Sequence, residues 1–224
     1  MSDNVRSSHT DGVVVIGLGR FGGAVAESLV RLGHEVLGID ESAEIVQSWA
    51  DRLTHVVQAD TTNGDTLRRL GAHEFERAVV GIGTDIEASV LTVLALSELG
   101  VPDIWAKAMT TKHGRILERT GAHHVVYPEA AMGERVAHLV TGKMIDFIEF
   151  DDGFAIVKTR APREVTGKTL AESGLRSRHG VTVVGVKRPR TDFTYARPET
   201  RIEDGDLLIV SGATKLVEKF AALT

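Results

Sequence analysis

A short glycine-rich stretch constrains the fold of this chain more than any other feature of its sequence. Four β-prone apolar residues, 13–16, run directly into Gly17-Leu-Gly19-Arg-Phe-Gly22, and apolar residues then recur at helical spacing. A strand, a Gly-x-Gly-x-x-Gly turn and a helix start in this order form a phosphate-binding cradle. Gly17 permits the tight turn, Gly19 lets the backbone approach a phosphate, and Gly22 lets the helix pack close to the strand. The first helical N–H groups and the positive end of the helix dipole then face the anion.

A carboxylate at the end of the next apolar run supports a nucleotide site. Residues 35–40 read Glu-Val-Leu-Gly-Ile-Asp, which places Asp40 about 20 residues beyond the glycine turn, as expected for a side chain that binds ribose hydroxyls. Asp40 would also repel a 2′-phosphate, which disfavours NADP. The alternative is a structural strand–helix turn without a ligand. The flanking patterns favour the nucleotide site.

Strand and helix patterns continue to alternate up to about residue 143. Continuous apolar strands separated by helices predict an α/β fold, a doubly wound, Rossmann-like parallel sheet with helices on both faces. Ligands of such sheets bind at the carboxyl ends of the strands, where the glycine turn, Asp40, Asp60 and residues 81–84 are expected to converge on one crevice. Further strands are expected at 53–60, 78–83, 103–107 and 123–127, and later helices at 42–50, 63–70, 85–96, 111–119 and 128–143, with caps at Ser42, Asn63 and Thr84 or Asp85.

The pattern changes after residue 144 and predicts a smaller α+β lobe. Residues 145–150 and 154–158 alternate as strands around Asp152-Gly153, which predicts a hairpin. A lobe of about 70 residues is marginal by itself, and dimerisation is expected to support it. The expected domains are a flexible leader at 1–11, a nucleotide-binding domain at 12–143 and a second domain at 144–224. Its other elements are expected as a short helical stretch that starts within 167–170, strands at 181–186 and 206–210, and a helix at 214–223.

Composition excludes several classes of protein. The 224 residues include no cysteine, which excludes disulfides and thiolate metal sites and fits a reducing cytoplasm. No apolar run approaches the ~20 residues of a membrane span. The nine histidines show no metal-ligand spacing. Residues 1–150 hold 13 basic and 21 acidic side chains, a net charge of −8, whereas residues 151–224 hold 13 and 10, a net charge of +3. The acidic first part argues against a nucleic-acid partner.

Three segments carry a family resemblance. They are Val-Ile-Gly-Leu-Gly-Arg-Phe-Gly at 15–22, Pro102-Asp-Ile-Trp-Ala-Lys-Ala108 and the more specific Tyr127-Pro-Glu-Ala-Ala-Met-Gly133. Together with the C-terminal lobe they resemble the regulatory subunits of Ktr/Trk-type bacterial potassium uptake systems, which consist of an RCK (regulator of potassium conductance) N-lobe and C-lobe. The likeness covers nearly the whole chain from Gly12 onward.

The resemblance implies a cytoplasmic protein that lies at the inner face of the membrane through a partner. That partner is a membrane-embedded potassium-translocating subunit, under which a homo-oligomeric ring of dimers, an octamer in the best-known members, assembles. ATP and ADP bind the glycine crevice and favour different ring shapes, and NAD(H) binds in some members. In several members the C-lobe dimer binds cyclic di-AMP.

Candidate binding residues combine the sequence patterns with this resemblance. Arg20, at the mouth of the helix, can grip a terminal phosphate or lie free in solvent, and the family places an Arg at the γ-phosphate. Asp60 with Thr61 can contact the adenine edge, or Asp60 can cap a helix. The expected nucleotide-binding set is Gly17, Gly19, Arg20, Phe21, Gly22, Asp40, Asp60, Thr61, Ile82, Gly83, Thr84, Lys107 and Glu129.

Two charged residues of this set leave alternatives open. Lys107 can contact a phosphate or be a surface lysine. Glu129 can complement the dipole of the helix that it begins. By resemblance, Glu129 can instead meet the phosphates of the partner subunit's nucleotide through a cation, since carboxylates and phosphates share Mg²⁺. Glu129 is therefore the expected metal ligand.

The second lobe carries a run of basic residues. Most runs of this kind are solvated surfaces. By resemblance to the cyclic di-AMP pocket, Arg176 and Pro198 occupy matching places, although Pro189-Arg-Thr-Asp stands where family members often have a basic turn. The run comprises Arg176, Arg178, Lys187, Arg188 and Arg190.

The sequence therefore predicts a cytosolic gating subunit that senses adenine nucleotides and is not an enzyme. An NAD-dependent oxidoreductase or an NAD(H)-sensing regulator is the alternative. Only about 70 residues follow the nucleotide fold, and no motif supplies an acid–base pair, which disfavours the oxidoreductase. Weak ATP hydrolysis stays open, although the sequence nominates no base. A transcriptional redox sensor would need a DNA-binding segment such as a basic winged helix, and the sequence offers none.

Overall fold

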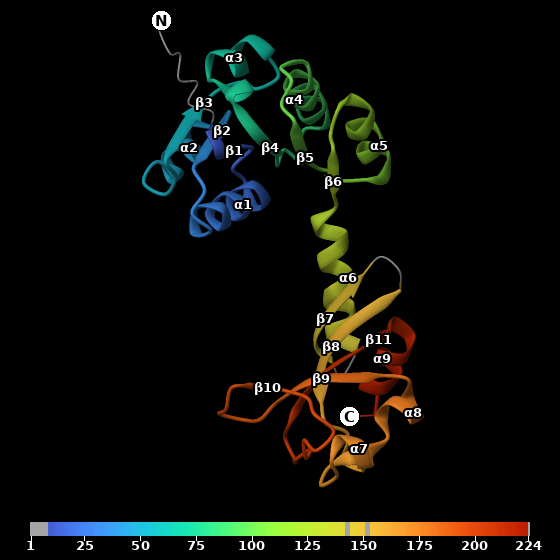
Figure 1. Cartoon of the computed structure of the whole chain (residues 1–224). Coiled ribbons are helices and arrows are strands. Elements are labelled where there is room, and N and C mark those ends of the chain that lie inside the picture. The colour runs from blue at the N-terminus through green and yellow to red at the C-terminus, as the bar shows by residue number, and fades with distance from the viewer. Residues whose placement is uncertain (1–8, 142–143, 151–152, 224) are drawn as a thin grey trace, which may run out of the picture. The chain divides into compact units, whose positions relative to one another are not determined.

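The computed structural model describes residues 9–141, 144–150 and 153–223 (Figure 1). The chain forms two compact units, Met1–Glu129 and Ala130–Thr224, and each has its own sheet and core. Most of the expected leader, residues 1–8, lies outside the described part, and the first strand begins at His9. The expected domain border after residue 143 falls beside the undescribed residues 142–143 and stays a prediction.

The first unit is built around a six-stranded sheet. Its strands are β1 (His9–Ile16), β2 (Val36–Asp40), β3 (His55–Gln58), β4 (Phe75–Val80), β5 (Asp103–Lys107) and β6 (His124–Val126). They lie in the order β3-β2-β1-β4-β5-β6, and every neighbouring pair is parallel. The predicted doubly wound α/β fold is confirmed. The direction of strand addition reverses between β1 and β4, which is where such sheets open a crevice for ligands.

Helices connect these strands on both faces of the sheet. They are α1 (Arg20–Arg31), α2 (Ala43–Trp49), α3 (Gly64–Arg69), the short 3-10 helix η1 (Ala72–Glu74), α4 (Ile86–Glu98) and α5 (Thr111–Thr120). Helix α6 (Pro128–Thr141) follows the last of these strands and continues into the second unit. Val14 and Ile16 of β1 pack with α3, α4 and α5, whereas Val13 and Val15 pack with α1 and with Trp49 of α2. None of the helices in the described part has the length and apolar character needed to span a bilayer.

Three of the predicted helix caps are confirmed. The Ser42 side chain accepts a hydrogen bond from Ile45 N (3.4 Å), Asn63 caps α3, and Asp85 rather than Thr84 caps α4. The fourth strand was expected at 78–83, but β4 ends at Val80. The glycine-containing loop that follows borders the site described below.

The second unit contains a five-stranded antiparallel sheet. Its strands are β7 (Met144–Phe150), β8 (Phe154–Arg160), β9 (Thr182–Lys187), β10 (Phe193–Tyr195) and β11 (Leu207–Ala213), in the order β10-β9-β11-β8-β7. The predicted hairpin is β7–β8, and the predicted α+β character is confirmed. Helices of this unit are η2 (Arg163–Val165), α7 (Leu170–Ser173), α8 (Leu175–His179) and α9 (Thr214–Ala221), besides the greater part of α6.

The expected short helical stretch is α7, which begins at Leu170 because Thr169 and Glu172 form a capping box that fixes the start. The edge strand β10 was missed. It has only three residues, all of them exposed, and Phe-Thr-Tyr is too short a pattern to mark a strand.

Candidate functional site

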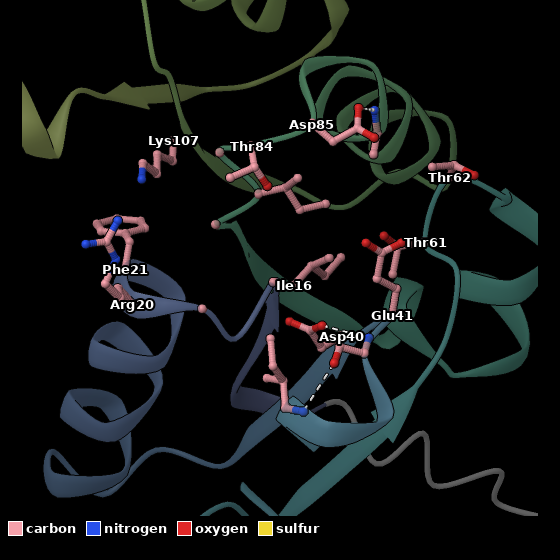
Figure 2. A pocket seen from close by; sticks show the side chains of 18 of the residues that line it. Ile16, Arg20, Phe21, Asp40, Glu41, Thr61, Thr62, Thr84, Asp85 and Lys107 are labelled. Atoms are coloured by element: carbon pink, nitrogen blue, oxygen red, sulfur yellow. Dashed lines mark hydrogen bonds between the residues drawn. The ribbon is translucent and has the colours of Figure 1, made fainter. Parts of the chain in front are cut away.

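A pocket of about 500 Å³ opens at the carboxyl ends of the strands of the first unit (Figure 2). Its walls come from the β1–α1 turn, the end of β2, the loops after β3 and β4, the end of β5 and the first turn of α6. The structure thus brings together segments spread over more than 100 residues, as the sequence analysis expected. Twelve of the predicted residues line it: Gly17, Gly19, Arg20, Phe21, Asp40, Asp60, Thr61, Ile82, Gly83, Thr84, Lys107 and Glu129.

The three glycines of the turn are required for different structural reasons. Gly17 has φ +82°, a conformation that side chains rarely adopt. Gly22 does not line the pocket; a Cβ there would lie 1.9 Å from Gly17 O, so its small size lets α1 approach the strand. A Cβ at Gly19 would meet nothing within 4 Å and would enter the pocket space. Gly19 therefore leaves the pocket open at the turn.

The N-terminus of α1 borders the pocket without a cap. Among the described residues no side chain accepts a hydrogen bond at Gly19, and the first turn of α1 holds no acidic residue. The N-terminus of α4 also borders the pocket, but Asp85 Oδ1 accepts a hydrogen bond from Ala88 N (2.9 Å). Of these two helix starts, α1 is the one that can offer free N–H groups to an anion.

Asp40 is held in place by the backbone. Its side chain is almost fully buried, Oδ2 accepts a hydrogen bond from Leu18 N (2.7 Å), and Oδ1 accepts one from Ser42 N (2.9 Å). These two bonds were not foreseen. A carboxylate has about four acceptor sites, so each oxygen can accept one more bond, for example from a ribose hydroxyl. The bond to Leu18 also ties Asp40 to the glycine turn.

The structure changes the interpretation of Asp60 and Thr61. Asp60 Oδ1 accepts hydrogen bonds from Thr62 N (2.9 Å) and Thr62 Oγ1 (2.6 Å), and these bonds lower the pKa of the Asp60 carboxyl. Asp60 thus closes a turn, and the helix-cap alternative is wrong because Asn63 caps α3. The Thr61 hydroxyl is buried against the Thr92 hydroxyl (2.9 Å), so its hydrogen-bonding capacity is partly used.

A close ion pair joins Lys107 and Glu129 at the edge of the pocket. Lys107 Nζ lies 2.6 Å from Glu129 Oε1 and 5.8 Å from the centre of the Phe21 ring. The Lys107 side chain is only 11% exposed, so it is not a surface lysine. Lys107 lowers the pKa of the Glu129 carboxyl, with a smaller effect from Arg20.

The charges of the pocket are divided between its two ends. Figure 2 shows Arg20, Phe21 and Lys107 on one side, and Asp40 with Glu41 on another. A ligand with a negatively charged group at one end and hydroxyl donors at the other matches this arrangement. Within the described ranges, no three His, Cys, Asp or Glu side chains lie together as a metal-binding group, so Glu129 is not part of a complete protein cage.

Part of the lining was not predicted from the sequence. Most of the missed residues are chain neighbours of predicted ones, and proximity in sequence was the available signal. Ile45, Ala88 and Met109 carry no motif, because they reach the pocket only through the packing of their elements. The missed residues are Ile16, Glu41, Ser42, Ile45, Ala59, Thr62, Asp85, Ala88 and Met109, while Gly81 belongs to the segment 81–84 that was expected at the crevice.

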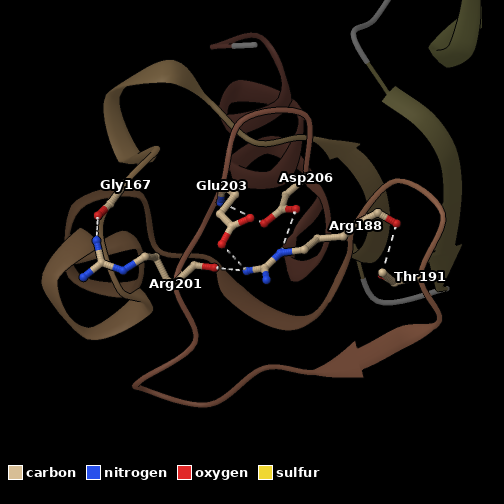
Figure 3. A network of polar contacts seen from close by, with 6 residues as sticks. All are labelled: Gly167, Arg188, Thr191, Arg201, Glu203 and Asp206. Atoms are coloured by element: carbon tan, nitrogen blue, oxygen red, sulfur yellow. Dashed lines mark hydrogen bonds and ion pairs between the residues drawn. The ribbon is translucent and has the colours of Figure 1, made fainter.

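The basic run of the second unit is not uniformly solvated. Arg188 lies 3.4 Å from the fully buried Asp206 and 3.3 Å from Glu203, and it donates a hydrogen bond to Arg201 O (2.8 Å; Figure 3). Arg188 is thus a structural residue. Arg176, on α8, and Pro198, after β10, are exposed.

Comparison with known proteins confirms the predicted resemblance. Residues 13–128 match the TrkA-N domain and residues 154–224 match the TrkA-C domain. Ktr system potassium uptake protein A of Bacillus subtilis (strain 168) is 37% identical over 207 residues, which cover 92% of this chain and 93% of that protein. The Vibrio alginolyticus protein of the same name is 35% identical over 211 residues, 93% of this chain and 96% of that one.

Solved structures share the fold at lower identity. The GsuK channel bound to NAD superposes with a TM-score of 0.64 at 20% identity, over 100% of this chain and 40% of that chain. GsuK bound to ADP gives a TM-score of 0.52 at 15% identity, over 59% and 35%. This chain spans less than half of the GsuK chain, and at these identities the likeness concerns the fold.

Proposed function

The chain belongs to the family of TrkA-N and TrkA-C domain proteins that includes the Ktr potassium uptake proteins, and from this premise we propose that it is a nucleotide-sensing regulatory subunit. In this proposal it acts in the cytoplasm, at the inner face of the membrane, and controls a separate potassium-translocating subunit. The observation that carries the nucleotide part is the division of charge in the pocket, with Arg20 and Lys107 at one end and Asp40 at the other.

ATP and ADP are the proposed ligands. The uncapped start of α1 and the space at Gly19 are suited to the phosphates, with Arg20 and Lys107 neutralising their charge. Asp40 is oriented to accept hydrogen bonds from the ribose, while Asp60, Thr61 and residues 82–84 border the remaining space for the base. When a divalent cation is bound, Glu129 can share it with the phosphates. ATP and ADP differ only at the phosphate end, so the sensing must occur there.

Self-association is the second part of the proposal. Helix α6 presents three apolar residues at a spacing of four, Met132 (55% exposed), Val136 (45%) and Val140 (78%), which lie on one face. An exposed apolar stripe of this kind favours burial against another copy of the chain. The stripe fits the proposed dimers within a ring, for which an octamer is the expected size. Cyclic di-AMP at Arg176 and Pro198 of the second unit stays a prediction from the family resemblance.

An NAD(H)-responsive regulator of the same kind is the second candidate. The same pocket polarity suits a dinucleotide, and the structural relative GsuK has been solved both with NAD and with ADP. We propose a binding role for the pocket and no enzymatic activity, because its residues are assigned to ligand contacts.

Native mass spectrometry of the purified protein, followed by calorimetric titration with ATP, ADP and NAD, tests the proposal. We expect an oligomer that binds ATP and ADP at one site per chain. A monomer that binds NAD alone would refute it and favour the oxidoreductase.

A further inference from the structure

The loop between β5 and α5 carries Met109, a residue of the pocket wall. A Cβ built at Gly83 would lie 3.2 Å from Met109 Sδ and 3.1 Å from Lys107 Nζ, so the thioether and the ammonium group both lie against this glycine. Met109 is 45% exposed, so burial of its own side chain does not fix its position. The contacts of its backbone must do so.

Two hydrogen bonds hold this loop where it leaves the sheet. Ala108 N donates to Val126 O of β6 (2.8 Å), which continues the pairing of β5 by one residue. Met109 N donates to Nδ1 of His113 (3.3 Å), and His113 N donates to Thr110 Oγ1 (3.1 Å). Thr110 is the N-cap of α5, and His113 stands three residues further on, where a glutamate or glutamine reaches back in a capping box. A histidine takes that part here, and it holds the residue before the cap.

The His113 imidazole can hold Met109 only in its neutral form. The residue is 1% exposed, and burial lowers the pKa of its imidazole below the ordinary value. Because Nδ1 accepts from Met109, the proton of the neutral ring is on Nε2, which has no hydrogen-bond partner among the described residues. An imidazolium would turn Nδ1 into a donor that faces another donor, and it would bury a charge.

We propose that His113 is a positioning residue for the phosphate end of the pocket, and that it acts through Met109 on the wall that also carries Lys107. His113 itself does not line the pocket. Its neutral ring fixes the N–H of Met109, and Met109 shares with Lys107 the contact to Gly83. Without this bond residue 109 can shift, and the ammonium group loses the neighbour that confines it. This inference rests on the proposed nucleotide-binding function and adds to it a residue outside the pocket.

Calorimetric titration of His113→Leu and His113→Asn with ATP tests the inference. Leucine and asparagine are similar in size and both omit part of the ring, but only asparagine offers an acceptor oxygen near the position of Nδ1. We expect ATP to bind about two- to tenfold more weakly to His113→Leu than to the wild-type protein, the effect of one lost hydrogen bond. We expect His113→Asn to bind ATP within about twofold of the wild type.

A double-mutant cycle tests whether the effect passes through the basic wall. Lys107→Met removes the cation and keeps a side chain of similar length. In that background His113→Leu should weaken ATP binding less than it does in the wild-type protein, because the group whose place it disturbs is gone. Equal losses in the two backgrounds would show that His113 does not act on Lys107 and would overturn the inference.

A control on the same helix separates positioning from general stability. Leu117 is fully buried on α5, and Leu117→Val removes one methylene without touching the bond between His113 and Met109. Urea denaturation should show a lower free energy of unfolding for this variant, while its ATP affinity stays unchanged.

Three results would overturn the inference and leave the proposed function intact. They are unchanged ATP binding by His113→Leu, a loss that His113→Asn does not restore, and an equal loss in Leu117→Val. Failure of the wild-type protein to bind ATP, ADP or NAD would overturn the proposed function itself.

Discussion

Helices α1 and α4 both begin at the edge of the same pocket, but only the N-terminus of α4 is capped by a side chain. Helix α4 begins at Asp85, whose carboxylate accepts a hydrogen bond from Ala88 N. Helix α1 begins at Gly19, where within the described part of the chain no side chain supplies a cap. A capping side chain stabilises a helix by about 0.5–2 kcal/mol, so its omission at α1 is a cost in stability.

The difference indicates which of the two helix starts is open to an anion. The Asp85 carboxylate accepts a hydrogen bond from one N–H group of α4 and opposes the positive end of its dipole, while at α1 no side chain of the described residues does either. Arg20 and Lys107 lie at the same end of the pocket, so the open helix start and the basic side chains act together. Substitutions that make the two helix starts alike, or that remove a side chain acting with one of them, test this assignment.

The largest effect is expected from Gly19→Asp, which gives α1 the cap that α4 has. Gly19 has extended backbone angles suited to a cap, and a Cβ there meets nothing within 4 Å, so the fold should persist. The carboxylate would occupy the phosphate space with a like charge, and we expect ATP affinity to fall by about 100-fold or more. Gly19→Val should abolish binding by bulk alone.

Calorimetry measures the ATP affinity of both variants, and circular dichroism checks that they are folded. The matched control is Gly64→Asp, the same substitution at the start of α3. Gly64 does not line the pocket, and a Cβ there would make an ordinary 3.8 Å contact with Ala95. Normal ATP binding by folded Gly19→Asp would mean that the phosphates lie elsewhere.

The next effect is expected from Asp40→Ala at the opposite end of the pocket. Loss of hydrogen bonds to a charged acceptor costs about 1.5–3 kcal/mol, roughly tenfold to a hundredfold in affinity. ATP, ADP and NAD should weaken alike, because they share the ribose diol. Isothermal titration provides the affinities.

Asp40 also accepts a hydrogen bond from Leu18 N. Asp40→Ala could therefore lower nucleotide affinity by disturbing the glycine turn, and a control must separate this effect from the loss of a ribose contact. In the wild-type protein 2′-deoxy-ATP should bind more weakly than ATP, and in Asp40→Ala this preference should shrink. If the preference survives unchanged, Asp40 supports the turn and does not bind the ribose.

A third prediction concerns the fold itself. In Gly22→Ala the added Cβ would lie 1.9 Å from Gly17 O, so α1 must move away from β1. We expect the free energy of unfolding to fall by about 1–3 kcal/mol, the range for overpacked sites. Urea denaturation measures it. Stability equal to that of the wild type would show that the close approach of α1 is not required.

Much of this site could be predicted because the relevant signals are local. The glycine turn links a strand to a helix within a few residues, and parallel topology alone brings Asp40, Asp60 and residues 81–84 to one edge. The helix caps at Ser42, Asn63 and Asp85 are local signals of the same kind. The roles of these residues in binding stay predictions.

The rest depends on contacts that no local pattern encodes. Lys107 and Glu129 are 22 residues apart, and only the distance between their elements makes them an ion pair. Arg188 belongs to a basic run that predicts a solvated surface, but its partner Asp206 is buried 18 residues further on. In each case a charged residue looked free because its counter-ion comes from another element.

The smallest effect is expected from Asp85→Ala, which removes the cap of α4 and so makes it resemble α1. The helix should lose about 1 kcal/mol of stability, as measured by urea denaturation. ATP affinity should change less than twofold, because α4 lacks the basic side chains that accompany the start of α1, and an open helix end contributes little by itself when it is exposed to salt. Asp85→Asn is the matched variant, since an asparagine caps as well as an aspartate and should restore stability. A gain in ATP affinity of tenfold in both variants would mean that the Asp85 charge, and with it the start of α4, is part of the phosphate site, and the contrast between the two helices would then fail.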